Sequence, residues 1–110
     1  MDCFRIEGGH RLSGRVAVDG SKNASLPLMA AALLSDGPVD FSGIPELSDT
    51  ANMRRLLEEL GLEISRPTEG VTRFRTIDPT AVHARYDIVR TMRASICVLG
   101  PLLARRGKAV

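Results

Sequence analysis

The chain of 110 residues is long enough for one small domain with a modest core. Apolar residues make up 44% and charged residues 25%, which excludes the disordered and collagen-like classes. The net charge of +2 gives no global field that would indicate a nucleic-acid partner. With no Trp, one Tyr and three Phe, the core must be aliphatic, as is typical of helices packed on a sheet.

Two short strands are predicted before residue 20. One contains Phe4 and Ile6, the other contains Val16 and Val18, and glycine-containing turns separate them. Gly20 and the serine after it end the second strand.

A helix and a third strand follow. Apolar residues at helical spacing predict a helix that includes residues 26–34, in which Pro27 is tolerable only in the first turn. Asp36-Gly37-Pro38 ends this helix, and residues 39–41 alternate between apolar and polar as a strand does.

The second helix is the clearest amphipathic element. Ser48 or Asp49 can cap its start, and Gly61 is suited to end it. Its apolar stripe consists of Met53, Leu56, Leu57 and Leu60. Opposite charges four positions apart on its exposed face predict two ion pairs, Arg54 with Glu58 and Arg55 with Glu59.

A hairpin and a last helix complete the pattern. Residues 62–64 and 71–77 are predicted to pair as a hairpin, and Asp87 can cap the helix that follows. The apolar stripe of that helix is Ile88, Val89, Met92, Ile96 and Leu99. Gly100-Pro101 should kink or end it, and residues 108–110 resemble the start of a strand. The order ββαβαββα predicts an α/β (α+β) fold.

An internal repeat is visible at an offset of 70 residues. Ala24-Ser25-Leu26 matches Ala94-Ser95-Ile96, and a polar residue precedes each copy. The match suggests a duplicated unit whose helices begin near one place.

Cysteine, histidine and apolar patterns exclude several classes. Cys3 and Cys97 lie far apart without a secretory signal, which favours a reduced cytoplasm with both as small core residues. His10 and His83 have no partner at ligand spacing, so no metal site is predicted. The longest apolar stretch, residues 26–34, is too short to cross a membrane.

Two features could bind an anion. Residues 85–110 carry six basic side chains against one acid, although solvated helix faces would give the same excess. Lys22 and Asn23 lie at a glycine turn that enters a helix, where free N–H groups and the helix dipole favour phosphate or carboxylate. An ordinary capped helix has the same pattern, and both interpretations stay open. The turn is not a P-loop, because Val16 stands where that motif needs Gly.

Two long motifs resemble those of the enolpyruvyl transferases of cell-wall synthesis. The first is Gly20-Ser-Lys-Asn-Ala-Ser-Leu-Pro27, and the second is Tyr86-Asp-Ile-Val-Arg-Thr-Met-Arg-Ala-Ser-Ile96 followed by Leu99-Gly-Pro-Leu102. Both occur in the family's order and spacing, and the first five residues resemble the family's start. The resemblance therefore covers nearly the whole chain.

The resemblance implies a reaction and three site residues. The family transfers the enolpyruvyl group of phosphoenolpyruvate to the 3-hydroxyl of UDP-N-acetylglucosamine through a tetrahedral ketal, without a metal or organic cofactor. Lys22 would bind phosphoenolpyruvate and offset developing charge. Asn23 would orient the acceptor or the enolpyruvyl group. Arg93 would bind the UDP-sugar. These substrates imply a bacterial cytoplasmic enzyme of peptidoglycan synthesis, with no nucleic-acid or membrane partner.

The resemblance also implies that catalytic parts lie outside these 110 residues. The family's general acid, a cysteine or aspartate in a glycine-rich loop, is expected just beyond Val110, and Cys97 does not replace it. Each lobe of the family is an inside-out α/β barrel of repeated units. Residues 1–20 would then pair with the second lobe, and residues 21–110 would form part of the first. We expect the complete protein to be an enzyme and the chain alone to be inactive.

Other interpretations remain. The sister enzyme that makes enolpyruvylshikimate phosphate shares the fold, but its motif has Ser where this chain has Asn23. A non-catalytic module that binds RNA through arginines such as Arg93 is poorly supported, since only Tyr86 among the aromatic residues lies near them. A stand-alone structural remnant is also compatible with the sequence.

Overall fold

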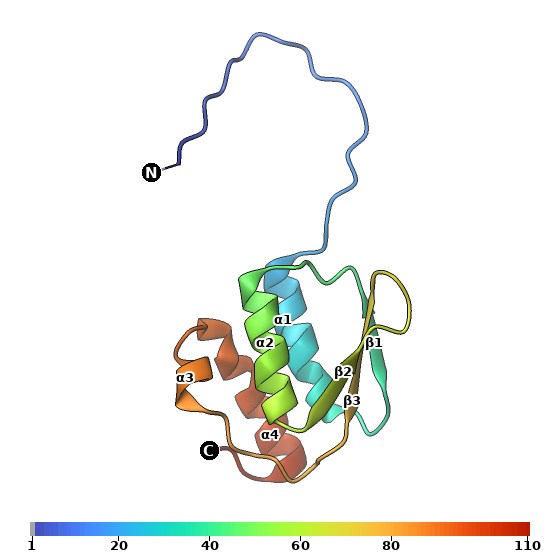
Figure 1. Ribbon diagram of the computed structural model, residues 1–110, viewed down its shortest axis with the longest axis vertical. Helices are drawn as coiled ribbons and strands as arrows, with labels where there is room; N and C mark the ends of the chain where they lie inside the picture. The colour runs from blue at the N-terminus through green and yellow to red at the C-terminus, as the bar shows by residue number, and fades with distance from the viewer. Residues whose placement is uncertain (1) are drawn as a thin grey trace.

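A three-stranded antiparallel sheet and a group of helices form the body of the computed structural model, which describes residues 2–110 (Figure 1). The strands lie in the order β1-β3-β2: β1 is Val39–Ser42, β2 is Leu62–Ser65 and β3 is Val71–Thr76. The α-helices are α1 (Lys22–Ala31), α2 (Ser48–Glu59), α3 (Tyr86–Val89) and α4 (Leu99–Arg106). Two 3₁₀ segments, η1 (Ala32–Leu34) and η2 (Arg93–Val98), adjoin α1 and α4. The fold is therefore mixed α and β.

The N-terminal segment, residues 2–20, contains neither of the two predicted strands and extends away from the body (Figure 1). Its large apolar side chains are almost fully exposed: Phe4, Ile6, Leu12, Val16 and Val18. A strand is stable only when a neighbour satisfies its N–H and C=O groups, and the described residues give this segment no such neighbour. Neither strand forms in this structure, and the pairing of residues 1–20 with a second lobe stays a prediction.

The sheet confirms the predicted hairpin and shows why its two faces differ. β2 and β3 pair with Ile64 opposite Phe74, and β1 joins the other edge of β3. The buried Phe74 ring meets the Phe41 ring edge-on, with centroids 5.7 Å apart. On the exposed side, ion pairs link directly opposite residues, Asp40 with Arg73 and Glu63 with Arg75. One face of the sheet therefore packs on the core and the other meets solvent.

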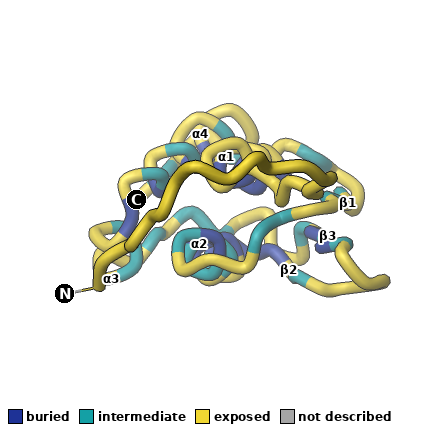
Figure 2. The backbone as a smooth tube through the Cα atoms, turned by 90° about the horizontal axis from the view of Figure 1, so that it is seen from above, coloured by how far each residue is buried: buried dark blue, intermediate teal, exposed yellow. Residues whose placement is uncertain are grey.

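The core lies between two layers of the fold. Figure 2 shows α1 and α4 on one side and α2 with β2 and β3 on the other. The predicted stripe of α2 is confirmed, because Met53, Leu56, Leu57 and Leu60 are all fully buried. The rest of the buried apolar set comes mainly from α1, η1 and the C-terminal third: Leu26, Met29, Ala30, Ala32, Leu33, Leu62, Phe74, Met92, Val98 and Leu102.

The polar details of α2 differ from the prediction. Leu47, not Ser48 or Asp49, is the N-cap residue, and its N–H donates to the Thr50 hydroxyl at 3.1 Å. The expected i,i+4 ion pairs do not form among the described residues, because partners outside the helix take the charges: Arg54 binds Glu46, and Glu59 binds Arg85. Gly61 ends the helix as predicted, with a positive φ of 81°.

The predicted continuous last helix is wrong. α3 ends at Val89, and Met92 adopts an extended conformation before η2 begins. Asp87 lies in the first turn of α3 without capping it, since Arg85 is the N-cap residue. Gly100 and Pro101 fall in the first turn of α4, where the missing proline N–H has no helical partner to lose. Pro27 is different. It is expected only in the first turn of its helix, but α1 begins at Lys22, so the proline lies past that turn.

The C-terminal residues pair with the segment before α3. The N–H of Val110 donates to the carbonyl of Val82, and the N–H of Ala84 donates to the carbonyl of Val110, both at 2.8 Å. Two bonds that flank one residue in this way are the pattern of a parallel strand pair. Residues 108–110 do not form a regular strand, so the predicted strand is present only as this pairing of Val110. Within residues 2–110, no helix has the length and apolar character that a bilayer crossing needs.

Candidate functional site

The start of α1 presents the predicted lysine and asparagine to solvent. Ser21 is the N-cap residue, and its hydroxyl accepts from the N–H of Ala24 at 3.3 Å. The buried Ser25 hydroxyl donates to the Ser21 carbonyl at 2.8 Å, which secures this turn from inside. Lys22 and Asn23 therefore occupy the first two helical positions, where N–H groups point out of the helix and favour negative charge.

Lys22 has a partner that the sequence analysis missed. Its Nζ lies 2.9 Å from a carboxylate oxygen of Asp49, in the first turn of α2. The lysine side chain is 44% exposed and the aspartate side chain 33%, so solvent reaches both groups. The sequence indicates Asp49 only as a helix cap, and no periodicity or motif predicts a contact between the starts of two separate helices.

The chain just before Lys22 rests on the connection between β1 and α2. A Cβ on Gly20 would lie 1.8 Å from the carbonyl oxygen of Gly43, so only glycine permits this approach. The backbone at Gly20, two residues before Lys22, is therefore held against the same connection that leads to Asp49. We call residues 20–23 the lysine turn.

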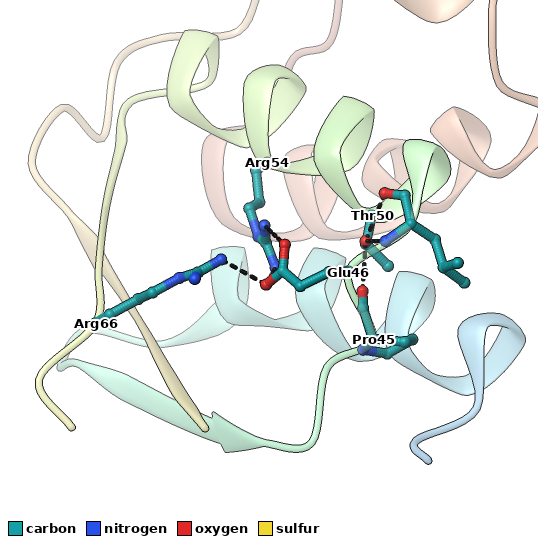
Figure 3. Close-up of polar contacts among 6 residues, drawn as sticks. Pro45, Glu46, Thr50, Arg54 and Arg66 are labelled. Carbon is teal, nitrogen blue, oxygen red and sulfur yellow. Dashed lines mark hydrogen bonds and ion pairs between the residues drawn. The ribbon is translucent and has the colours of Figure 1, made fainter. Parts of the chain in front are cut away.

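A cluster of polar contacts holds this connection in shape (Figure 3). Arg54 donates to both carboxylate oxygens of Glu46, at 3.0 and 2.9 Å, and Arg66 also donates to Glu46. The fully buried Thr50 hydroxyl lies 2.7 Å from the carbonyl of Pro45. The hydrogen bond from Arg54 is the largest cause that lowers the pKa of Glu46, and it outweighs the desolvation that raises it.

Arg93 is exposed at the start of η2, and η2 packs against α1. Among the described residues, Arg93 forms no ion pair and no side-chain hydrogen bond, and neither does the side chain of Asn23. The fold thus brings together the two elements that carry the predicted site residues. No hydrogen bond or ion pair among residues 2–110 joins Arg93 to Lys22 or Asn23.

The matching Ala-Ser segments of the repeat share one feature. Ser25 and Ser95 are both buried, and each hydroxyl donates to a preceding carbonyl, that of Ser21 and that of Val89. Their next residues differ, because Leu26 is buried whereas Ile96 is exposed.

Most of the other C-terminal basic residues contact neighbours within the chain. Arg85 pairs with Glu59, and Arg105 pairs with Asp36. Arg106 donates to the carbonyls of Leu60 and Ala81, and its burial lowers the pKa of the guanidinium. These contacts engage three of the six basic side chains of residues 85–110. Within residues 2–110 there is no cluster of three or more His, Cys, Asp or Glu that could hold a metal ion.

Comparisons with known proteins agree on one family. The family model described as EPSP synthase (3-phosphoshikimate 1-carboxyvinyltransferase) matches residues 6–110. UDP-N-acetylglucosamine 1-carboxyvinyltransferases from Maricaulis maris and Jannaschia sp. are each 49% identical, over 99% and 100% of this chain. The same enzyme from Yersinia enterocolitica is 47% identical over 98% of this chain. The chain spans about a quarter (26%) of the length of each of these relatives.

A solved structure shows the same relationship in three dimensions. The enolpyruvyl transferase NikO from Streptomyces tendae superposes with a TM-score of 0.71 at 26% sequence identity. The match covers 93% of this chain and 24% of that structure.

Proposed function

From the membership of this chain in the EPSP synthase family, we propose that the whole protein transfers the enolpyruvyl group of phosphoenolpyruvate to the 3-hydroxyl of UDP-N-acetylglucosamine and releases phosphate. The supporting observation is 49% identity to UDP-N-acetylglucosamine 1-carboxyvinyltransferase over 99% of the chain. This reaction would be the first committed step of peptidoglycan synthesis. The bacterial sources of the relatives support a cytoplasmic location. The prediction that both cysteines lie in the core is wrong for Cys3, which is exposed.

Three residues of the chain would act on the substrates. The Lys22 ammonium would bind phosphoenolpyruvate and stabilise the charge that develops as the ketal forms and phosphate leaves. The Asn23 amide, one position further into α1, would orient the reacting groups by hydrogen bonds. Arg93, exposed on η2, would bind the UDP-sugar through charge-assisted hydrogen bonds. The general acid would come from outside these 110 residues, so the chain alone would bind weakly and not turn over.

The arrangement of the whole protein is part of the proposal. Residues 21–110 would form part of a first lobe built as an inside-out α/β barrel, and residues 1–20 would pair with strands of a second lobe. The exposure of Phe4, Ile6, Val16 and Val18 supports this division, because an alternating apolar segment requires a partner sheet.

A chimera tests the proposed reaction directly. The 110 residues replace the matching quarter of the Maricaulis maris relative, and phosphate release from phosphoenolpyruvate is measured with each acceptor. We expect release with UDP-N-acetylglucosamine and none with shikimate 3-phosphate. Lys22→Ala should lower kcat/KM by about 100-fold or more, as loss of a charge-stabilising group does. Arg93→Ala should raise the KM for the UDP-sugar by about 10-fold.

The matched control is Lys108→Ala, which removes an exposed lysine without an assigned role. Its kcat/KM should equal that of the unmodified chimera. Release with shikimate 3-phosphate, or equal losses in the Lys22 and Lys108 variants, would contradict the assignment.

A further inference from the structure

We propose that Asp49 is the exchangeable counter-ion of Lys22, a positioning residue that holds the ammonium until an anionic ligand takes it and that lowers the affinity for that ligand. The inference rests on the proposed function only in assigning a phosphate-bearing ligand to Lys22. It adds a residue from a second helix to the site.

The ion pair joins two helix starts. The Lys22 Nζ approaches an Asp49 oxygen to 2.9 Å, and the residues lie in the first turns of α1 and α2. The two helices pack against each other. The carboxylate thus occupies the positive end of its own helix while it binds the cation on the neighbouring one.

The Asp49 carboxylate is held in place more firmly by its surroundings than the Lys22 ammonium is. Asp49 follows the connection that Thr50 and the Glu46 cluster hold, and Gly20 is seated on Gly43 of the same connection. Lys22 has a long flexible stem and is 44% exposed. An approaching anion can therefore draw the ammonium away while the Asp49 carboxylate stays behind.

The exposure of the pair determines the sign of the effect. An ion pair open to solvent contributes little to stability, so a dianionic ligand can displace it. The remaining carboxylate then repels that ligand at short range. Removal of its charge should tighten anion binding by about 3- to 10-fold at low ionic strength, with a smaller gain at high salt.

Inorganic phosphate is the probe, because the 110-residue chain contains both groups. Its dissociation constant is measured from the NMR shifts of the Lys22 and Asn23 amides at low and high salt. Asp49→Asn should bind phosphate about 3- to 10-fold more tightly than the unmodified chain. Asp49→Glu, which keeps the charge, should bind as the unmodified chain does.

The matched control is Glu63→Gln, which breaks an exposed ion pair of similar geometry, with Arg75 at 3.0 Å. Glu63→Gln makes the same change in net charge as Asp49→Asn, but Glu63 pairs with Arg75 and not with Lys22. The affinity of this variant for phosphate should therefore differ from that of the unmodified chain by less than about 2-fold. In a Lys22→Met background, Asp49→Asn should have no effect. A purely structural role of Asp49 would weaken binding or leave it unchanged, without dependence on Lys22.

Two results would overturn the inference: unchanged or weaker phosphate binding in Asp49→Asn, or an equal gain in Glu63→Gln. Should Asp49→Asn fail to fold, Asp49→Ser keeps a residue suited to a helix start and replaces it.

The chimera separates this inference from the proposed reaction. Tight phosphate binding in Asp49→Asn with an inactive chimera would refute the reaction alone, and an active chimera without an Asp49 effect would refute the counter-ion alone.

Discussion

At the scale of single residues, the geometry of the lysine turn depends on the absence of a side chain. Gly20 approaches the carbonyl of Gly43 so closely that the smallest substituent would collide with backbone. Backbone cannot move aside as a flexible side chain can, so either the turn or the β1–α2 connection would have to shift. The same shift would move Lys22 relative to Asp49.

The substitution Gly20→Ala tests this contact. We expect it to lower the free energy of unfolding by about 1–3 kcal/mol, as overpacking does, measured by urea unfolding followed by circular dichroism. Gly37→Ala is the matched control, because a Cβ at Gly37 meets no atom within 4 Å. Equal unfolding free energies for the two variants would contradict a tight approach at Gly20.

The acid sensitivity of the fold should depend in part on Glu46. Hydrogen bonds from Arg54 hold the pKa of this carboxyl below its usual value, and the Arg73 side chain does the same for the pKa of Asp40. A carboxyl whose pKa is lower in the folded state than in the unfolded state stabilises the fold above its unfolded pKa. That stabilisation is lost as the pH falls through the folded pKa.

We therefore expect the free energy of unfolding to fall as the pH decreases below about 4.3, the ordinary pKa of glutamate. Glu46→Gln should flatten this fall in urea titrations between about pH 5 and pH 3. Glu69→Gln removes an exposed carboxylate outside the cluster and should leave the slope as it is. A slope unchanged by Glu46→Gln would show that Arg54 does not hold that carboxylate in solution.

At the scale of elements, one buried hydroxyl organises the start of α2. The Thr50 hydroxyl lies 2.7 Å from the Pro45 carbonyl and 2.8 Å from the Leu47 carbonyl, and it accepts from the Leu47 N–H (Figure 3). Valine has nearly the same shape but can form none of these bonds. The N-cap N–H of Leu47 would then keep only its bond to the Pro45 carbonyl, at 3.1 Å.

Thr50→Val should lower the free energy of unfolding by about 1–3 kcal/mol, because the hydrogen bonds of the buried hydroxyl to Pro45 and Leu47 are lost. Thr68→Val, at an exposed turn position, should change it by less than about 0.5 kcal/mol. Thermal unfolding of both variants provides the measurement. A Thr50 variant as stable as the Thr68 variant would mean that water replaces the hydroxyl.

The elements predicted correctly are those whose signal is local. The stripe of α2, the glycine that ends it and the β2–β3 hairpin follow from spacing and turn residues within short windows. The break at Met92 could not be predicted this way, because the stripe from Ile88 to Leu99 continues across it, yet Ile96 is exposed. Packing of η2 against α1 overrides the helical period.

The candidate site likewise contains residues that the sequence predicts and one that it does not. Sequence motifs predict Lys22, Asn23 and Arg93 as site residues, and all three lie at exposed helix starts. Asp49 was not found as a site residue, because its contact with Lys22 depends on how two helices pack. The partners of Arg54 and Glu59 were missed for the same reason, since both lie outside α2.

At the scale of the whole molecule, the N-terminal segment dominates the dimensions. The radius of gyration is 17.3 Å, whereas a compact domain of this length has about 13 Å. The segment leaves the body at the start of α1 (Figure 1). Its large apolar side chains are exposed. It adds extent and apolar surface without adding to the core.

Deletion of residues 2–18 should therefore leave the free energy of unfolding within about 0.5 kcal/mol of the full chain. It should also reduce self-association, measured by size-exclusion chromatography with light scattering, because the exposed alternating segment is removed. A longer deletion through Lys22 removes the Ser21 cap and should cost about 1 kcal/mol more. Loss of stability from the shorter deletion would show that the segment packs on the body.

The strand order β1-β3-β2 also has a consequence for the time course of folding. β2 and β3 are joined by a short turn and can pair within microseconds, as hairpins do. β1 must instead reach the far edge of β3 across a loop that includes all of α2, so its docking carries a larger closure entropy. We expect mutations in the hairpin to slow folding, and mutations in β1 mainly to accelerate unfolding.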